Sequence, residues 1–325
     1  MQFLRREFLH LAKGAAALPV LSTIAGAQAY PTRPVRFIVG FPAGGGADFG
    51  ARLIGQWLSE RLGQQFVVEN RPGAASNLAA EAVVRALPDG YSLFLVTSAN
   101  ASNAALYEKL NFDLTRDIVP VAGIYSGIGV VVTNLSFPAK TIAEFIAYAK
   151  ANPGKINMAS GGNGSPPHLY GELFKAMTRI NMVHVPYRGG AAQALTDLIG
   201  GQVQVMFSDS TAIELVRAGK VRAIAVTSAT RSDALPGIPT LGEFVPGYEA
   251  GAWIGVGVPR NTPDTVVEKL NKEINAGLAD PKMKSQLADR GYTVLPGSPS
   301  DFGKHIAQET EKWGKVIKFA NIKPD

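Results

Sequence analysis

Residues 37–51 read FIVGFPAGGGADFGA, and this stretch decides the fold class. Residues 37–39 predict the end of a buried strand, and a loop with three consecutive glycines, residues 44–46, follows. Asp48 occupies the predicted N-cap of a helix that extends to about Leu62. A glycine loop between a strand and a helix predicts an anion site, because glycines let a ligand approach the backbone and the first helical turn presents unpaired N–H groups. A turn that binds nothing is the alternative, but three glycines cost more backbone entropy than a simple connection requires.

Strand and helix patterns alternate along the rest of the chain. The predicted strands of the first half cover residues 35–39, 66–69, 92–97, 119–124 and 129–133. Those of the second half cover residues 156–159, 182–185, 203–207 and 221–227. Polar residues 98–102 are predicted to form a loop. This alternation predicts open, mainly parallel sheets that helices cover on both faces.

The second half of the chain repeats the architecture of the first. The strand at residues 182–185 leads into Gly189 and Gly190, as the first strand leads into the glycines at 44–46. Ligands bind outside the carboxyl ends of strands in open α/β sheets, so the two glycine loops are expected to face one another across a cleft. Two amphipathic helices are predicted near the C-terminus, at about residues 264–279 and 299–319.

Composition and the N-terminal segment indicate an exported globular protein. A length of 325 residues suggests about two domains, and 46% hydrophobic residues are typical of a folded chain. Residues 1–29 contain Arg5 and Arg6, an apolar alanine-rich stretch and a small-x-small motif. They predict a twin-arginine-like signal peptide cleaved after Ala29, with an ordinary Sec signal as the alternative. The net charge of +6 is scattered, so nucleic acid is not an expected partner. The sequence has no cysteine, which excludes thiol catalysis.

A hydrolase is one alternative to a binding protein. Ser160 and Ser165 lie close to His168 in a glycine-rich loop. The G-x-S-x-G pattern of a strained nucleophile turn is absent, so Ser–His catalysis is disfavoured. His184 and His305 are interpreted as structural residues, and no histidine pair has the spacing of a zinc site.

A dinucleotide-binding loop is the second alternative. Gly44, Gly46 and Gly50 follow a strand and open a helix, and Glu69 ends the next strand, where a ribose-binding acid is expected. Two extra residues lengthen the turn before the glycines, and the last glycine comes one position late. No P-loop lysine follows, so the match to a nucleotide site is weak.

Several side chains at strand ends have both a structural and a ligand-binding interpretation. Asp48 is favoured as a helix cap, although its carboxylate could also receive a ligand group. Arg188 could pair with a ligand carboxylate or point to solvent. Asp209 could contact a ligand or make a buried hydrogen bond. Phe41 and Tyr187 are predicted to form walls of the cleft.

Seven motifs in a fixed order make the sequence similar to one protein family. They are FPAGG with Asp48 and Arg52, ENRPGA from Glu69, PDGY from Pro88, SGGNGSPPHL from Ser160, VPYRG from Val185, GGQV from Gly200 and PTL from Pro239. With these motifs the chain resembles the Bug (TctC-like) extracytoplasmic solute receptors of tripartite tricarboxylate transporters. The resemblance spans nearly all of residues 31–325.

The resemblance implies a two-lobed binding protein of the periplasmic type II class. Each lobe would be a mainly parallel sheet flanked by helices, and a hinge of two chain crossings would join the lobes. We place the crossings near residues 125–132 and 247–253. Lobe 1 then covers residues 30–128 plus 251–325, and lobe 2 covers residues 129–250. Glycines that could supply hinge freedom are Gly127, Gly129, Gly247 and Gly251.

In that family the glycine loop of the first lobe and a Tyr-x-Gly loop of the second hold a small carboxylate through backbone amides and ordered waters. Carried over, this implies a site that both lobes supply. From the first lobe come Phe41, Ala43, Gly44, Gly45, Gly46 and Asp48. From the second come Tyr187, Arg188, Gly189, Gly190 and Ala191, with Ser98, Ser160, His168 and Asp209 as further lining.

Two loops depart from the family pattern. The family usually has small-Ala-Pro after the glycine of the second loop, whereas this chain has Gly190-Ala191-Ala192. It also favours glycines after Gly73-Ala74, whereas this chain has Ala75-Ser76. Both loops could shape the pocket, so the ligand cannot be copied from a relative.

The sequence therefore predicts a monomeric, non-catalytic periplasmic receptor that needs no cofactor or metal. Its expected ligand is a small organic acid, either a dicarboxylate or an acidic amino acid. Its expected partners are the membrane permease subunits of a TctA/TctB type transporter. An exported dinucleotide-binding oxidoreductase and a ligand-sensing module of a two-component system remain the alternatives.

Overall fold

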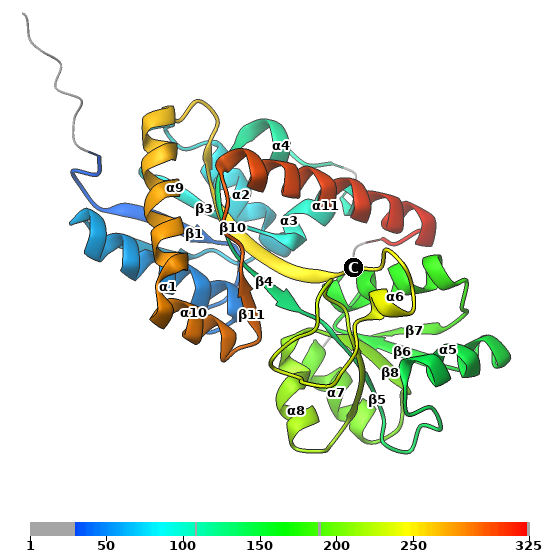
Figure 1. Cartoon of the computed structure of the whole chain (residues 1–325). Helices are drawn as coiled ribbons and strands as arrows, with labels where there is room; N and C mark the ends of the chain where they lie inside the picture. Colours follow the sequence, from blue (N-terminus) through cyan, green and yellow to red (C-terminus); the bar gives the residue numbers. More distant parts are fainter. Residues whose placement is uncertain (1–29, 108, 188–189, 324–325) are drawn as a thin grey trace, which may run out of the picture.

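The chain forms two lobes, each built around one sheet (Figure 1). The computed structural model describes residues 30–107, 109–187 and 190–323, so the predicted leader lies outside the described residues. Strands of the first sheet come from two separate parts of the chain, and the residues between these parts supply the second sheet. No helix in the described part of the chain is both long and apolar enough to cross a membrane.

The first sheet has the strand order β11-β4-β10-β3-β1-β2. β1 lies between β2 and β3 and is parallel to both, whereas β10 is antiparallel to β3 and β4, and β11 is antiparallel to β4. All six residues of β3, SLFLVT, are buried, as expected of a strand covered on both faces. The strands are β1 (Val35–Val39), β2 (Phe66–Asn70), β3 (Ser92–Thr97), β4 (Ile118–Ile128), β10 (Gly251–Pro259) and β11 (Tyr292–Val294).

The second sheet has the strand order β7-β6-β8-β5-β9. β6 is parallel to β7 and β8, whereas β5 is antiparallel to β8 and β9. The strands are β5 (Val130–Thr133), β6 (Asn157–Ser160), β7 (Val183–Pro186), β8 (Val205–Ser208) and β9 (Arg222–Val226).

Both sheets are mixed, so the prediction of mainly parallel sheets is wrong. Every antiparallel pairing involves β4, β5 or β10. Parallel neighbours in one sheet require a crossover connection, usually a helix. β4, β5 and β10 instead enter or leave their sheets directly at the passage between lobes, so they run against their neighbours.

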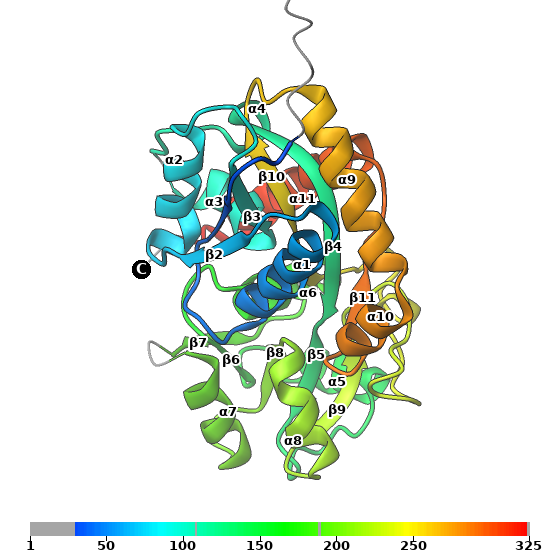
Figure 2. The ribbon, with the colours of Figure 1, turned by 90° about the vertical axis from the view of Figure 1, so that its left-hand side faces the viewer.

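Helices flank the two sheets (Figures 1 and 2). α1 packs against α9, where the Trp57 indole donates to the carbonyl of Glu273 (2.8 Å). The helices are α1 (Gly46–Leu62), α2 (Asn77–Val84), α3 (Ser98–Leu106), α4 (Leu114–Asp117), α5 (Ile142–Ala151), α6 (Pro166–Thr178), α7 (Ala191–Ile199), α8 (Ile213–Arg217), α9 (Asp264–Ala279), α10 (Pro281–Ala288) and α11 (Pro299–Ala320).

The polar residues 98–102, predicted as a loop, are the first turns of α3. Thr97 is the N-cap of this helix, and its backbone N–H donates to Asn100 Oδ1 (2.9 Å). This reciprocal capping box satisfies helix-terminal donors and allows a Ser-, Ala- and Asn-rich segment to begin a helix. The loop prediction failed because those residue types are common in turns and at helix N-termini alike.

Thr227 joins the two chain crossings. β4 passes into β5 at Gly129, whose N–H donates to the Thr227 hydroxyl (3.0 Å), and that hydroxyl donates to the carbonyl of Ala250 (2.6 Å). The Thr227 backbone also bonds Gly129 and Ala250. A Cβ on Gly129 would lie 2.4 Å from the Thr227 hydroxyl, so close packing explains this glycine.

Helix α11 packs in both lobes, although the predicted division assigns it to lobe 1 alone. Trp313, Val316 and Ile317 lie in the same core cluster as Phe145 and Phe174 of the second lobe. Earlier in the helix, Phe302 and Ile306 belong to a core cluster of the first lobe. The helix therefore forms a third connection between the lobes, beside the two chain crossings.

Candidate functional site

The glycine loop connects the carboxyl end of β1 to the start of α1. Ala43, Gly44 and Gly45 are exposed, and Phe41 is half-buried against the first-lobe core. Gly44 has φ +88°, a conformation that favours glycine. No heavy atom lies within 4 Å of a Cβ placed on Gly44. α1 begins at Gly46 on the side of the first lobe that faces the second (Figures 1 and 2).

Asp48 is not the N-cap of α1, which corrects the sequence-based prediction. The helix begins two residues earlier, and its N-cap is Gly45, which has no side chain to cap with. The carboxylate of Asp48 instead accepts hydrogen bonds from Gly44 N–H, Arg52 Nε and Asn70 Nδ2, each 2.9 Å long. Asn70 Nδ2 also donates to the carbonyl of Phe41 (3.0 Å). Asp48 therefore holds the glycine loop from beneath, and both of its oxygens are engaged.

This network makes Asp48 a carboxylate that contributes to stability only when it is ionised. Burial raises the pKa of Asp48, but the hydrogen bonds from Arg52, Gly44 and Asn70 lower it, so that the pKa lies below the usual value. A carboxyl whose folded pKa is depressed stabilises the fold above its unfolded pKa of about 3.9, and this contribution is lost as the pH falls through the folded value.

We therefore expect Asp48→Asn to lower the free energy of unfolding by about 2 kcal/mol at pH 7, since hydrogen bonds to a charged group are the stronger kind. The difference from the wild type should begin to shrink as the pH falls below the unfolded pKa of about 3.9, and it should be lost below the depressed folded pKa, where the native carboxylate is neutral as well. Urea unfolding at pH 7 and pH 3 measures both values, and Asp233→Asn, a change at an exposed carboxylate, is the control. A difference that stays constant with pH would contradict this account.

The third glycine of the loop has a packing role that the sequence did not reveal. A Cβ on Gly46 would lie 2.5 Å from the Tyr292 hydroxyl and 3.3 Å from that of Tyr125. One turn later, a Cβ on Gly50 would lie 2.4 Å from Ile254 and 2.8 Å from Tyr125. The two tyrosine rings stack 4.1 Å apart beneath the start of the helix. No local motif predicts these tyrosines, because β4 and β11 bring them to α1 from distant parts of the chain.

In the second lobe, Ser160 and His168 lie in one buried cluster at the carboxyl end of β6. Ser160 Oγ is 2.7 Å from His184 Nε2, and the ring of His184 stacks on that of His168 at 3.6 Å. His168 Nδ1 accepts the N–H of Gly164, and its Nε2 is 3.6 Å from Glu172. Ser160 is 0% exposed, so its hydroxyl is closed to a substrate. The serine pairs with His184, which was predicted as structural, and not with His168.

Tyr187 follows β7 and is anchored to α7. Its hydroxyl donates to Asp197 (2.8 Å), and burial, followed by this hydrogen bond, raises the pKa of Tyr187 to about 12. The phenol therefore stays protonated at neutral pH. Gly190, with φ +83°, is the N-cap of α7, which begins at Ala191. Arg188 and Gly189 lie outside the described residues.

The remaining predicted residues also mark helix starts at strand ends. Ser98, half-buried, is the first residue of α3 after β3. Asp209 follows β8 and accepts hydrogen bonds from the backbone N–H and the hydroxyl of Thr211, so its carboxylate caps a short turn. Helices α1 and α3 begin after strands β1 and β3 of the first sheet, and α6 and α7 begin after β6 and β7 of the second. The first turns of these helices therefore offer backbone donors at the strand ends of both sheets.

The comparison with known families shows to which family this chain belongs. Residues 51–322 match the sequence model of the tripartite tricarboxylate transporter family receptor, TctC. The chain belongs to the TctC family. The solved structure of the periplasmic binding protein BugD is 34% identical, with a TM-score of 0.74, and the match covers 91% of this chain and all of that one.

Two other solved structures that are similar to this chain contain ligands. Rpa4515 of R. palustris, solved with adipate, is 37% identical, with a TM-score of 0.78 over 91% of this chain and 100% of that one. MatC of Rhodopseudomonas palustris, solved with malate, is 31% identical, with a TM-score of 0.74 over 89% of this chain and 100% of that one. These similarities confirm the family and the two-lobed fold of periplasmic binding proteins expected from the sequence motifs.

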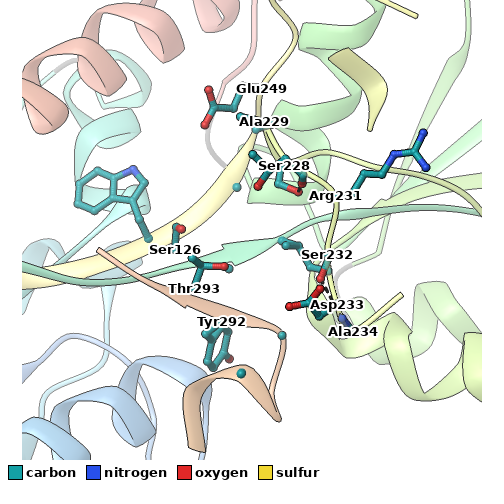
Figure 3. Close-up of a pocket in the computed structure, with 18 of the residues that line it drawn as sticks. Ser126, Ser228, Ala229, Arg231, Ser232, Asp233, Ala234, Glu249, Tyr292 and Thr293 are labelled. Carbon is teal, nitrogen blue, oxygen red and sulfur yellow. Dashed lines mark hydrogen bonds between the residues drawn. The ribbon is translucent and has the colours of Figure 1, made fainter. Parts of the chain in front are cut away.

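A cavity of about 220 Å³ lies at the hinge of this TctC protein, away from the glycine loops (Figure 3). Ser126 and Thr293 form one wall, and the loop with Ser228, Ser232 and Asp233 forms the other. The carboxylates of Glu249 and Glu309 also line it. The lining also includes the cations Arg231 and Lys312, so its charges are mixed. None of the predicted site residues borders this cavity, so it is not the site that the sequence predicted.

A second hollow, of about 550 Å³, borders the glycine loop itself. Gly44, Gly45 and Gly46 line it together with Arg52 and Arg290. Arg290 lies over the ring of Phe49, 4.0 Å from its centre. Asp48 also lines the hollow and pairs with Arg52, so the positive potential at this edge of the loop comes mainly from the guanidinium of Arg290, and it attracts an anion.

Proposed function

We propose that this TctC protein binds a small carboxylate between its lobes and delivers it to a tripartite tricarboxylate-type transporter. One observation carries the proposal. The exposed glycine loop before α1 and the Gly190 turn before α7 present helix N-termini at strand ends of two different sheets. Helix N-termini stabilise a carboxylate without the desolvation cost of a buried ion pair.

The ligands of the relatives support the choice of an organic acid. The two R. palustris structures hold adipate and malate, which are both dicarboxylates. In this chain the carboxylate of Asp48 is turned into its own network, so it does not oppose an anion at the loop amides. We therefore place a dicarboxylate or an acidic amino acid in the site. The proposed contacts include Arg188 and Gly189 of the second loop.

The hydrogen bonds of Glu69 argue against the dinucleotide alternative. Glu69, the candidate ribose acid, accepts hydrogen bonds from Arg36 (2.7 and 3.0 Å) and Arg71 (3.0 Å). Its carboxylate is therefore already paired with two guanidinium groups. The relatives are binding and receptor proteins, and the proposed chemistry is reversible binding without turnover.

Ligand binding is proposed to close the lobes about the two crossings at Gly129 and Ala250. A ligand that contacts both lobes binds the closed form more tightly and shifts the population toward it. Permease subunits of the TctA/TctB type would then recognise the closed form. The proposal includes a periplasmic monomer, exported by the leader of residues 1–29 and cleaved after Ala29.

A thermal-shift screen of C3–C8 mono- and dicarboxylates tests the proposal. An acid present at 100 times its Kd should stabilise the fold by about 2.7 kcal/mol and raise the melting temperature accordingly. The diamides of the same acids are the control, because they keep the chain length and remove the charge. If no acid raises the melting temperature, or if a diamide acts as well as its acid, the proposed function is wrong.

A further inference from the structure

Three consecutive non-glycine residues adopt left-handed backbone conformations at the carboxyl edge of the first sheet. Ala74, Ala75 and Ser76 have φ values of 45°, 49° and 77°. For residues with a Cβ this region costs on the order of 1–2 kcal/mol each. Such strain persists where the surrounding structure enforces it, and it is found preferentially at functional sites.

The strained turn covers buried polar side chains that lack partners. Ser76 Oγ, Asn77 Nδ2, Asn100 Nδ2 and Asn103 Oδ1 are buried and have no hydrogen-bond partner in the structure. Their residues are at most 4% exposed. A buried polar atom without a partner costs about 1–3 kcal/mol, so a polar group brought to this cluster would gain hydrogen bonds.

These four side chains belong to one cluster. Asn103 Nδ2 donates to the carbonyl of Ala75 and to Asn77 Oδ1, both at 2.8 Å. Asn100 lies three residues before Asn103 and so shares its face of α3. The described hydrogen bonds of the four side chains involve no charged group. The cluster offers both donors and acceptors and is neutral.

The cluster borders the glycine loop. A Cβ on Gly40 would lie 1.9 Å from Ser76 Oγ, so this hydroxyl sits against the first residue after β1, where the glycine loop starts. Ala74 and Ala75, immediately above, are exposed. The cluster therefore lies beside the segment that leads into the glycine loop, next to the exposed residues of the strained turn.

We infer that Ser76, Asn77, Asn100 and Asn103 form a neutral polar subsite for a hydroxyl group next to the ligand's carboxylate, which makes 2-hydroxy acids the preferred ligands. The inference rests on the proposed function. A second carboxylate does not fit here, because burying it without a cation is costly. A hydroxyl both donates and accepts, so it satisfies the unpaired Asn amide and Asn carbonyl together.

Calorimetry on matched pairs of acids tests the subsite. The pairs are succinate and malate, glutarate and 2-hydroxyglutarate, and adipate and 2-hydroxyadipate. At least one hydroxy acid should bind the wild type about tenfold more tightly than its unsubstituted partner. Ser76→Ala keeps the Cβ and the backbone conformation but removes the hydroxyl. It should reduce that preference to threefold or less without changing the affinity for the unsubstituted acid.

Thr133→Val is the control, because Thr133 is a fully buried residue of the second lobe whose hydroxyl also lacks a partner. It should leave the preference unchanged. Equal binding of both members of every pair, or an equal loss of both in Ser76→Ala, would overturn the subsite while leaving the receptor function intact. Failure of all six acids to bind would instead overturn the receptor function, and the subsite with it.

Discussion

Glu309→Ala should lower the free energy of unfolding by about 3 kcal/mol or more, because it removes the acceptor of a buried charged network. Glu309 Oε2 accepts the indole N–H of Trp253 in β10 (3.1 Å) and that of Trp313 in α11 (2.9 Å), and Oε1 pairs with Lys312. The substitution leaves the indole donors of two buried tryptophans and an ammonium group without this acceptor. Urea unfolding followed by circular dichroism measures the loss.

The same helix supplies a matched control for this prediction. Glu311 pairs with Lys315 at 2.6 Å, but both side chains are mostly exposed. Exposed pairs contribute about 0–1 kcal/mol, so Glu311→Ala should change the stability by less than 1 kcal/mol. Similar losses for the two variants would show that Glu309 does not stabilise the contact of α11 with both lobes.

Gly45→Val should weaken the binding of every accepted acid at least 100-fold and leave the fold intact. Gly45 is exposed, its φ is −81°, and the only atom within 4 Å of an added Cβ is the carbonyl oxygen of Pro42 at 3.9 Å. The backbone therefore accepts a branched side chain without strain. The new methyl groups would stand over the amides that the ligand approaches, so that the carboxylate loses those hydrogen bonds.

Calorimetry with the best acid of the thermal-shift screen measures the loss of binding, and the melting temperature of the free protein reports the fold. Gly200→Val is the control, because Gly200 has a φ of −73° and lies at the far end of α7, away from the glycine loop. Affinity retained within a factor of about three, a difference below 1 kcal/mol, would show that the glycine loop is only structural.

The alternation of strands and helices was predictable from local patterns, because burial on both faces imposes apolar runs and glycine marks the loops. Most of the predicted site residues lie between the end of a strand and the first turn of the next helix. The roles of individual residues were less predictable. Asp48 was expected to cap its helix, but Asn70 and Arg52 together bind its carboxylate from other positions. Hydrogen-bond partners across strands leave no local signal.

The sequence by itself determined the family, the two-lobed α/β fold and the glycine loop as the candidate anion site, since motif order and hydrophobic spacing are properties of the chain. Only the tertiary structure decided the mixed strand directions and the hydrogen bonds by which Thr227 joins the two chain crossings. It also decided the packing of α11 in both lobes and the contact of the two tyrosines with Gly46. These features depend on contacts between residues far apart in the chain. Such contacts form only when the whole core packs, so no single stretch of sequence encodes them.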